Sequence, residues 1–564
     1  MFLSLIVVFA SIHSDRIDLL DVMKEYADDV SEIKLKDGEY CARDLPLKHR
    51  KLTFIGNVDT VTLDMRGLSE SAFDLESSTL TLISISIKPP QLAVFTKSKF
   101  SKLNVTSCKF VTKEMEYPIL EGISSQLIVQ NVSFTEIHFM YSLIQGPPGD
   151  NEAVLSLIVQ NCSFSNFRVH TQRPLLAGAD VQNVSVVDTS FSEIKCTNVD
   201  PLPDEAIEGT ADREVSIQKS TISNVDGALS GALVFGMQAT KLYLIHVTIE
   251  DSANAIRHSN NVAFAPKSEV VVRMCTTKFT KTTEVWPNGG FLYLPHNQSM
   301  LTIHHTTADH SSAPNGSGGW VFVSGQCDLD LQLVTSKDTS AGKCGGFVFA
   351  GGMVEKLLFS EVDVNDSKAE ENGGALFVSN AREVQISHGV FMRCGSIQNG
   401  GAVFVDKADE TTVTFERDIF DDNEASKGHG PDVVISYDEA KTYRVQKADF
   451  VKCVSTAKQN GVWFLPFNVG TEWSNTRELA NRQIIVVSVV CGCVFLALCI
   501  LIPCLACCCY RRRKNAAYKQ IETEQQPNYS ESQSTRPSHA PNEGQNDPQT
   551  QINYQQSSPQ SINS

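Results

Sequence analysis

Three histidines that lie close together in the sequence are the first candidates for a metal site. His304, His305 and His310 stand in a segment of alternating apolar and polar residues, and imidazole nitrogens are common zinc ligands. Consecutive side chains of a β-strand point to opposite faces, so His304 and His305 cannot face the same ion. We therefore expect solvated histidines, with no metal site and no cofactor.

Two adjacent carboxylates near a glycine-flanked histidine form the second candidate site. Asp421 and Asp422 precede Gly428-His429-Gly430, and this combination resembles part of the active site of polygalacturonases. The resemblance implies one acid that protonates the leaving oxygen and one that activates water. Polygalacturonases also need an upstream Asp motif and a downstream basic motif, and neither occurs here at matching positions. We therefore expect no catalytic residues.

Seven Asn-X-Ser/Thr sequences in the part of the chain that we expect to be extracellular are candidate sites of N-linked glycosylation. They begin at Asn104, Asn131, Asn161, Asn183, Asn297, Asn315 and Asn365. Several of them lie just before a recurring Phe, so we expect glycans along one face of the protein. The alternative is that some arise by chance, because Asn and Ser are common turn residues.

The 16 cysteines fall into two groups. Those of the first group are Cys41, Cys108, Cys162, Cys196, Cys275, Cys327, Cys344, Cys394 and Cys453. An oxidising compartment would permit disulfides among them, but their odd number leaves the pairing open. The second group lies in or beside an apolar segment near the C-terminus. Cys504, Cys507, Cys508 and Cys509, at its inner boundary, are candidates for palmitoylation, and apolar filler is the alternative.

The two ends of the chain predict a membrane-anchored protein. Residues 1–14 form an apolar run of signal-peptide length, with a buried N-terminal strand as the alternative. Residues 484–509 carry no charge and exceed the roughly 20 residues that cross a bilayer as a helix. The basic run 511–514 holds the C-terminal side in the cytoplasm. We therefore expect a type I single-pass protein of the plasma membrane, with its ectodomain outside the cell.

The last segment, residues 510–564, is rich in Gln, Asn, Ser and Pro. This composition is typical of disorder, so we expect a disordered cytoplasmic tail. Tyr518 and Ile521 are spaced as in a tyrosine-based sorting signal. The motif resembles the signals that clathrin adaptors bind in extended form, which implies a clathrin adaptor as a partner.

A glycine-rich motif recurs through the extracellular part and is the most informative pattern in the sequence. Two small residues are followed by alternating apolar residues, and taking the second small residue as the marker gives intervals of 27 to 31 residues. The clearest copies are GGFLY at Gly289, GGWVF at Gly318, GGFVF at Gly345, GGALF at Gly373 and GGAVF at Gly400. We place GHG in the same series, with Gly430 as its marker.

A second motif keeps the same rhythm and reaches further towards the N-terminus. LIVQNVSF at Leu127 and LIVQNCSF at Leu157 differ at one position. The copies end at Phe110, Phe134, Phe164, Phe191, Phe279, Phe391, Phe420 and Phe450. Each unit therefore offers short alternating strands separated by turn residues.

A unit of this size cannot bury its apolar face alone, but stacked copies share a continuous core. We therefore predict an all-β fold, a right-handed parallel β-helix over residues 51–464. A β-propeller needs longer blades, and a leucine-rich repeat needs a consensus that is absent. We expect a capping segment at 15–50, with helical character at 17–30, and a stalk at 465–483. A single transmembrane helix follows.

The GGALF and GGAVF units, together with FDDN at 420–423, resemble the GGA(I/L/V) and FxxN repeats of polymorphic outer membrane proteins. The resemblance covers residues 230–470. Bacterial members end in a β-barrel, whereas this chain ends in a predicted helix and tail, as in single-pass relatives on the surfaces of parasitic protists. The resemblance implies surface display, adhesion and antigenic variation.

The net charge of −17 is carried mainly outside the tail. A negative field repels phosphate backbones, so we expect no nucleic-acid partner. Our main hypothesis is a non-enzymatic adhesin or recognition rod on the cell surface, with an extracellular protein or glycan as ligand. The alternative is a membrane-tethered polysaccharide hydrolase or lyase with a pectin lyase-like fold. A third hypothesis is an endocytic receptor that uses Tyr518.

Overall fold

The computed structural model describes residues 16–471, with gaps at 27–29, 141, 147–154, 171–174, 177–180, 198–213, 227–240, 254–255, 258–267, 283–286, 295–298, 409–410, 438–447, 458–460 and 466–468. These residues all belong to the first of two compact units, 1–481. The predicted signal peptide 1–14, the predicted membrane helix 484–509, the candidate palmitoylation cysteines and the Tyr518 motif lie outside the described residues. Within the described ranges, no helix has the length and apolar character to cross a bilayer.

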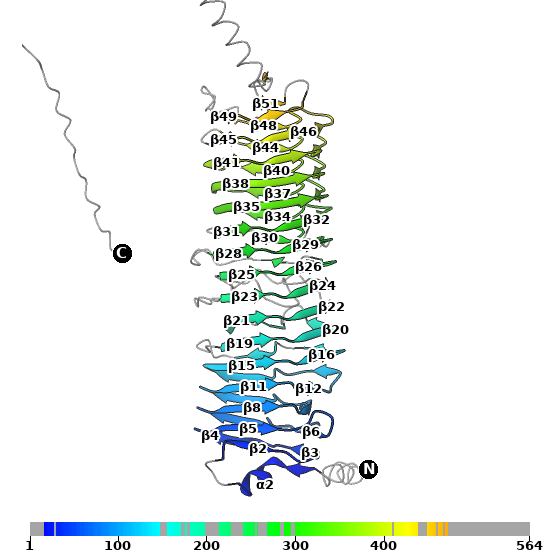
Figure 1. The fold of residues 1–564 in the computed structure, drawn as a ribbon, viewed down its shortest axis with the longest axis vertical. Helices are drawn as coiled ribbons and strands as arrows, with labels where there is room; N and C mark the ends of the chain where they lie inside the picture. The colour runs from blue at the N-terminus through cyan, green and yellow to red at the C-terminus, as the bar shows by residue number, and fades with distance from the viewer. Residues whose placement is uncertain are drawn as a thin grey trace, which may run out of the picture. The chain divides into compact units, whose positions relative to one another are not determined.

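The described residues form a parallel β-solenoid of the right-handed type. Figure 1 shows its strands stacked coil upon coil, with residues far apart in sequence side by side. Adjacent coils pair strand to strand in parallel, as Leu127 to Leu157 and Val129 to Val159 illustrate. The prediction of an all-β parallel solenoid is confirmed.

Most strands belong to one large sheet that bends sharply within each coil. Before the bend lie β2 (Glu32–Lys34), β5 (Lys51–Ile55), β8 (Thr79–Ile83), β11 (Lys102–Thr106), β15 (Ser125–Gln130), β19 (Leu155–Gln160), β21 (Val181–Val187), β23 (Glu214–Gln218), β25 (Lys241–Ile245), β28 (Ser268–Arg273), β31 (Ser299–His304), β41 (Glu383–Ser387), β45 (Thr412–Glu416) and β49 (Ala448–Val451). Strands β35 (Cys327–Lys337) and β38 (Val354–Asn365) run through the bend.

The strands that follow the bend complete this sheet. They are β1 (Ile17–Asp18), β3 (Gly38–Cys41), β6 (Val61–Asp64), β9 (Ser86–Lys88), β12 (Lys109–Phe110), β13 (Glu114–Met115), β16 (Ser133–Thr135), β17 (His138–Phe139), β20 (Ser163–His170), β22 (Ser190–Thr197), β24 (Thr221–Asp226), β26 (Thr248–Glu250), β29 (Thr276–Lys278), β32 (Thr307–Asp309), β42 (Val390–Met392), β46 (Ile419–Asp421) and β50 (Val454–Ser455).

Three smaller sheets close the coils. The first contains β4 (Leu45–Lys48), β7 (Phe73–Glu76), β10 (Thr96–Lys99), β14 (Leu120–Ile123) and β18 (Ile144–Gln145). The second contains β27 (Ile256–Arg257), β30 (Leu292–Leu294), β34 (Val321–Ser324), β37 (Val348–Gly351), β40 (Leu376–Ser379), β44 (Val403–Asp406), β48 (Val433–Ser436), β51 (Val462–Leu465) and β52 (Val469–Thr471). The third contains β33 (Ser312–Ala313), β36 (Ser340–Ala341), β39 (Lys368–Ala369), β43 (Gly395–Ser396) and β47 (Glu424–Ala425).

The recurring Phe residues form an inner stack where the sequence predicts it, with two exceptions. Phe110, Phe134, Phe164 and Phe191 are buried, and neighbouring rings lie 4.7–5.1 Å apart. The prediction is wrong for Phe279, which lies two residues beyond this column and is 44% exposed. Thr277 takes the place of Phe in that coil, and its Oγ1 accepts a hydrogen bond of 2.8 Å from Trp320 Nε1. A buried indole N–H needs such an acceptor.

Phe450 is the second exception. It pairs with Phe415 on the strand before the bend, with ring centroids 5.0 Å apart, rather than with Phe420 after it. The motif that ends at Phe450 is therefore one strand out of step with the others. Its apolar alternation matches both strands of the coil, which is why the sequence does not separate them.

The glycine pairs mark a tight corner, and the two glycines serve different purposes. Gly345 has φ +65°, a backbone that glycine adopts without strain. Gly346 has ordinary φ, but a Cβ there would collide with the carbonyl oxygens of Gly374 and Lys368 in the next coil. In the GHG copy the register pairs Val403 with Val433. That pairing places Gly430 level with Gly400, the first glycine of its pair. The motif series predicts Gly430 level with the second glycine, so that assignment is wrong by one residue.

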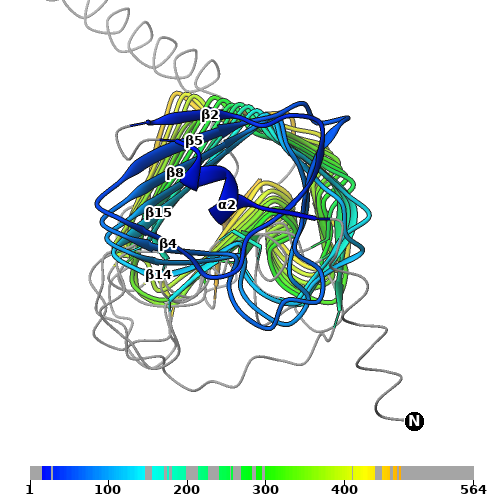
Figure 2. The ribbon, with the colours of Figure 1, turned by 90° about the horizontal axis from the view of Figure 1, so that it is seen from below.

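The first coil of the described stack is covered, and so is the last strand of one small sheet at the other end. Helix α2 (Leu19–Lys24) lies over the interior of the first coils (Figure 2), and its Leu19 is fully buried in the core. Arg16 and Arg66 bind the buried carboxylate of Asp64, with N–O distances of 3.1 and 2.6 Å. At the other end β52 pairs antiparallel with β51. Unpaired strand edges attract other chains, so we expect these elements to limit end-to-end association.

Candidate ligand-binding groove

From Ser84 onwards, the bend of the large sheet is made in each described coil by one residue with a left-handed backbone. Its φ lies between 47° and 60° in every described copy. We call these positions the first corner, and they are Ser84, Ser107, Asn131, Asn161, Asp188, Lys219, His246, Met274, His305, Leu333, Glu361, His388, Arg417 and Lys452. Non-glycine residues adopt this backbone at a cost of about 1–2 kcal/mol. The stack of coils therefore enforces the bend, whatever the side chain.

The residue after each first-corner position points into the core and is usually small. Cys162 and Thr189 fill this place in adjacent coils, and each donates a hydrogen bond to the carbonyl two residues earlier, at 3.2 and 3.0 Å. Burial raises the pKa of the thiols in this column, to about 11 for Cys275 and about 12 for Cys453. The eight cysteines with described side chains are free. These thiols therefore act as small apolar side chains with a weak donor.

A groove runs along the outside of the first corner over four coils. Its volume is about 560 Å³. One wall is formed by the corner side chains Asn131, Asn161, Asp188 and Lys219, and the other by Ser133, Ser163, Ser190 and Thr221. The groove exists because side chains on either side of the bend diverge outwards, and all eight of these wall side chains are polar or charged.

Hydrogen bonds link the first two coils along each groove wall. Asn161 Nδ2 donates to Asn131 Oδ1 at 2.6 Å, and Ser163 Oγ donates to Ser133 Oγ at 2.8 Å. Each donor is 30 residues from its acceptor in sequence. The walls therefore present ordered donors and acceptors at the coil spacing of about 4.8 Å.

The predicted glycosylation sites do not share a single position in the coil. Asn131 and Asn161 are level with each other and line the groove. Asn104 instead pairs with Thr81 and Ile128, on the strand before the bend. The side chains of Asn131, Asn161, Asn183 and Asn315 are exposed, those of Asn104 and Asn365 are half-buried, and Asn297 lies outside the described residues.

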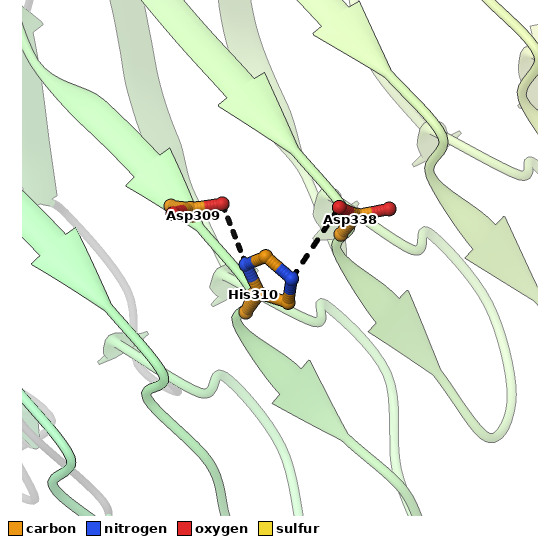
Figure 3. A group of neighbouring side chains, drawn as sticks. All are labelled: Asp309, His310 and Asp338. Atoms are coloured by element: carbon orange, nitrogen blue, oxygen red, sulfur yellow. Dashed lines mark hydrogen bonds and ion pairs between the residues drawn. The ribbon is translucent and has the colours of Figure 1, made fainter.

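The three histidines lie at different places in the coils. His304 points outwards from β31, with Nε2 3.7 Å from Asp330, and His305 stands at the first corner. His310 stands at a second left-handed corner, where Figure 3 shows it between two carboxylates. Its Nδ1 lies 2.6 Å from Asp309 and its Nε2 lies 3.4 Å from Asp338. The sequence reasoning missed this cluster, because Asp338 belongs to the next coil.

The cluster at His310 is arranged as an imidazole held between two anions. One atom from each side chain lies within 4.8 Å of the others. However, the two carboxylates contact opposite nitrogens of the ring, so one ion could not contact all three groups in this ring orientation (Figure 3). The ring also contacts the ring of Phe279, with centroids 4.8 Å apart and the two planes tilted by 39°.

The polygalacturonase-like residues are engaged separately. Asp421 accepts a hydrogen bond of 2.7 Å from Thr456 Oγ1. His429 stacks on Trp463 at 4.3 Å, and its backbone N–H donates to Asn399 Oδ1. Within the described part of the chain, neither Asp421 nor Asp422 forms a hydrogen bond or ion pair with His429.

Comparisons with known proteins give matches to solved structures alone. No family model matches the chain, so the resemblance to polymorphic outer membrane proteins gains no support. No curated protein sequence matches it either. The coarser prediction, a parallel β-solenoid, is confirmed.

Three solved structures illustrate these matches. The catalytic domain of GH87 alpha-1,3-glucanase in complex with nigerose has 8% identity and a TM-score of 0.26, with 80% of this chain and 67% of that one covered. PfbA, a surface adhesin of Streptococcus pneumoniae, has 9% identity and a TM-score of 0.27, with 67% and 86% covered. The PL6 family alginate lyase AlyGC has 9% identity and a TM-score of 0.17, with 79% and 98% covered.

These matches correct one prediction from the sequence. We expected that the chain is not an enzyme, yet the solved structures similar to it include a glycoside hydrolase and a polysaccharide lyase. We therefore withdraw the exclusion of catalysis. The exclusion was based on the missing polygalacturonase motifs, and other enzymes with this fold need not carry those motifs.

Proposed function

We propose that the protein is a recognition rod on the cell surface and binds an extended ligand along its side. A signal peptide at 1–14 directs the chain out of the cell, and a helix at 484–509 anchors it. The groove at the first corner is the contact site. The observation that carries the proposal is the pair of polar walls: one presents a hydroxyl in each of four coils, and the other presents Asn131, Asn161, Asp188 and Lys219. A repeating surface of this kind suits a repeating ligand.

Two epitope tags test the topology. A tag after residue 14 should be stained on intact cells, and a tag at the C-terminus should be stained only after permeabilisation. Staining of the C-terminal tag on intact cells would contradict a type I anchor.

Binding is tested with the full chain displayed on cells. Displaying cells should capture other cells or immobilised glycans, and Ser190→Glu should weaken capture because it puts a charge into the groove wall. Ser216→Glu is the matched control, because Ser216 points outwards from β23 on the other side of the bend. If both variants capture as well as the parent, the groove is not the contact site.

A hydrolase that acts on polysaccharides is the second candidate function. The observation that favours it is the approach of Asp309 and Asp338 to within 4.8 Å of each other at their ligand atoms. Carboxyl groups of retaining glycosidases stand about 5 Å apart. The His310 ring would have to turn away before a sugar oxygen reached both acids. Release of reducing ends, abolished by Asp338→Asn and by Asp309→Asn, would support this function.

The remaining predictions concern modification and traffic, and they stay proposals. Exposed Asn131, Asn161, Asn183 and Asn315 are the sequons best placed to carry glycans, and mass spectrometry of tryptic glycopeptides tests them.

Palmitoylation at Cys504, Cys507, Cys508 and Cys509 is tested by hydroxylamine-sensitive labelling. Replacement of Tyr518 by Ala should increase surface retention if the tail binds a clathrin adaptor.

A further inference from the structure

A column of hydroxyl side chains extends from the groove far beyond it. On the outer face of the strands that follow the first corner, eight consecutive coils carry Ser or Thr at the same register position. This hydroxyl ladder consists of Ser133, Ser163, Ser190, Thr221, Thr248, Thr276, Thr307 and Thr335. It is bounded by Lys109 on one side and Asp363 on the other. The first four members form one wall of the groove.

The four coils along the groove carry a second hydroxyl column two residues further on. Its members are Thr135, Ser165, Ser192 and Ser223. Thr135 and Ser165 lie 3.2 Å apart at their oxygens. All twelve side chains are exposed or half-buried. A hydroxyl donates one hydrogen bond and accepts two, so each member retains capacity for a ligand even where it bonds to its neighbour.

Charges beside the ladder alternate in sign. Beyond Ser223 the second column continues with Glu250, Lys278, Asp309 and Lys337. At the first corner, Asp188 is followed by Lys219. Opposite charges on neighbouring coils cancel at short range, so this face selects neither a polyanion nor a polycation. The matching ligand is uncharged and forms hydrogen bonds in both directions.

We propose that the hydroxyl ladder and the groove bind a linear, uncharged polysaccharide that lies parallel to the solenoid axis. This inference rests on the proposed function and names its ligand class. Sugar hydroxyls extend the hydrogen-bond chains that already run between coils, at Ser163 to Ser133 and at Asn161 to Asn131. Seven coil steps of about 4.8 Å give a contact length of about 34 Å.

The contact length predicts how affinity depends on ligand size. Each further sugar along the ladder adds weak contacts to the same molecule, so affinity rises with chain length. It should level off when the oligosaccharide spans about 34 Å, because longer chains extend past the last hydroxyl. A ligand held only in a local pocket would reach full affinity with two or three sugars.

The test measures binding of the full-length chain in detergent to immobilised polysaccharides. The probes are size series of linear β-1,3-, β-1,4- and α-1,4-linked glucans, with polygalacturonate as polyanion and chitosan as polycation. Ser190→Glu and Thr221→Glu are expected to weaken glucan binding about tenfold or more, because each buries an unpaired charge under the ligand. Ser190→Ala should weaken it less. Ser216→Glu should bind as the parent does.

The variants avoid Ser133 and Ser163, because these hydroxyls also complete the sequons of Asn131 and Asn161. Binding is measured before and after enzymatic removal of N-linked glycans, since a glycan at either Asn would extend from the groove wall. Thermal unfolding of each variant confirms that it is folded. Binding of a neutral glucan in either state, lost in Ser190→Glu and retained in Ser216→Glu, supports the proposal.

The outcomes separate this inference from the proposed function. If displaying cells capture targets and Ser190→Glu reduces capture, while no neutral glucan binds, the ligand class is wrong and the recognition rod stands. Tighter binding of polygalacturonate or chitosan than of every glucan overturns the inference in the same way. If capture is absent altogether, the proposed function fails as well.

Discussion

Asp418 is a buried carboxyl group in the small-residue column behind the first corner. It is fully buried, and its Oδ1 accepts a hydrogen bond of 2.6 Å from the backbone N–H of Gly389. Gly389 leaves the space that the longer side chain needs, since a Cβ there would lie 3.1 Å from Asp418 Oδ1. Burial raises the pKa of Asp418 to about 8. The carboxyl is therefore protonated in the folded protein at neutral pH.

This raised pKa predicts a dependence of stability on pH. The folded protein holds the proton up to about pH 8, whereas the unfolded chain releases it near pH 4. The stabilising contribution is complete below about pH 4 and is lost as the pH rises towards 8, at no more than about 1.4 kcal/mol per pH unit. Asp418→Asn, which retains the acceptor, should be more stable than the parent at pH 8 and similar to it at pH 4.

Urea unfolding of the parent and the variant at these two pH values checks the prediction. Asp421→Asn is the control, because Asp421 is half-buried on the adjoining strand β46. A stability difference between parent and Asp418→Asn that is independent of pH would show that the carboxyl is not protonated in the folded state.

At the scale of the elements, the glycine pairs specify how closely neighbouring coils approach. The sequence predicts the corner from these pairs, and it predicts the inner Phe stack, because both depend on residue types that recur with the coil. The first corner could not be predicted in this way. Its left-handed backbone is imposed by the coils on either side, so Lys219, Met274 and Leu333 occupy it as well as Asn131.

The candidate groove was missed for the same reason. Its walls contain Ser, Thr and Asn, which the sequence reasoning interpreted as turn residues and sequons. The register that aligns them requires the bend to be known first. One signal in the sequence could have revealed the ladder. Ser133, Ser163 and Ser190 recur at the repeat interval, each directly before a recurring Phe and after an apolar strand.

Substitution of a second-position glycine tests the tight corner. Gly346→Ala should destabilise the protein by about 3 kcal/mol, because the added methyl meets two backbone carbonyls that cannot move independently of the next coil. Gly395→Ala is the matched control one strand away. Its nearest contact would be Glu424 O at 3.9 Å, so its effect should stay within about 1 kcal/mol. Denaturant midpoints of the two variants give the comparison, and equal midpoints would refute it.

For the solenoid as a whole, stability depends on covered ends as well as on the stacked core. The sequence indicated a helical cap at 17–30, and the structure contains the short helix α2 within that segment. Burial raises the pKa of Asp64, but hydrogen bonds from Arg66 and the charge of Arg16 lower it below its ordinary value overall. The ionised carboxylate of Asp64 therefore binds Arg16, the residue that precedes β1 and helix α2.

The cap can be opened with a single substitution. Leu19→Asp puts a charge into the apolar end of the core, so we expect loss of stability and concentration-dependent association of the full chain through exposed strand edges. Leu20→Asp is the control, because the neighbouring Leu20 is 42% exposed. Light scattering of both variants at several concentrations measures the effect. Association of the two to the same extent would show that α2 does not protect the end.

The tolerance of the first corner has an evolutionary consequence. Because the coils impose its backbone, the outward side chain at any first-corner position can be exchanged without changes in the core. Substitutions at the first corner can therefore accumulate almost independently, and each changes the surface of the protein without changing its fold. Lineages that share this scaffold are expected to diverge fastest along that line.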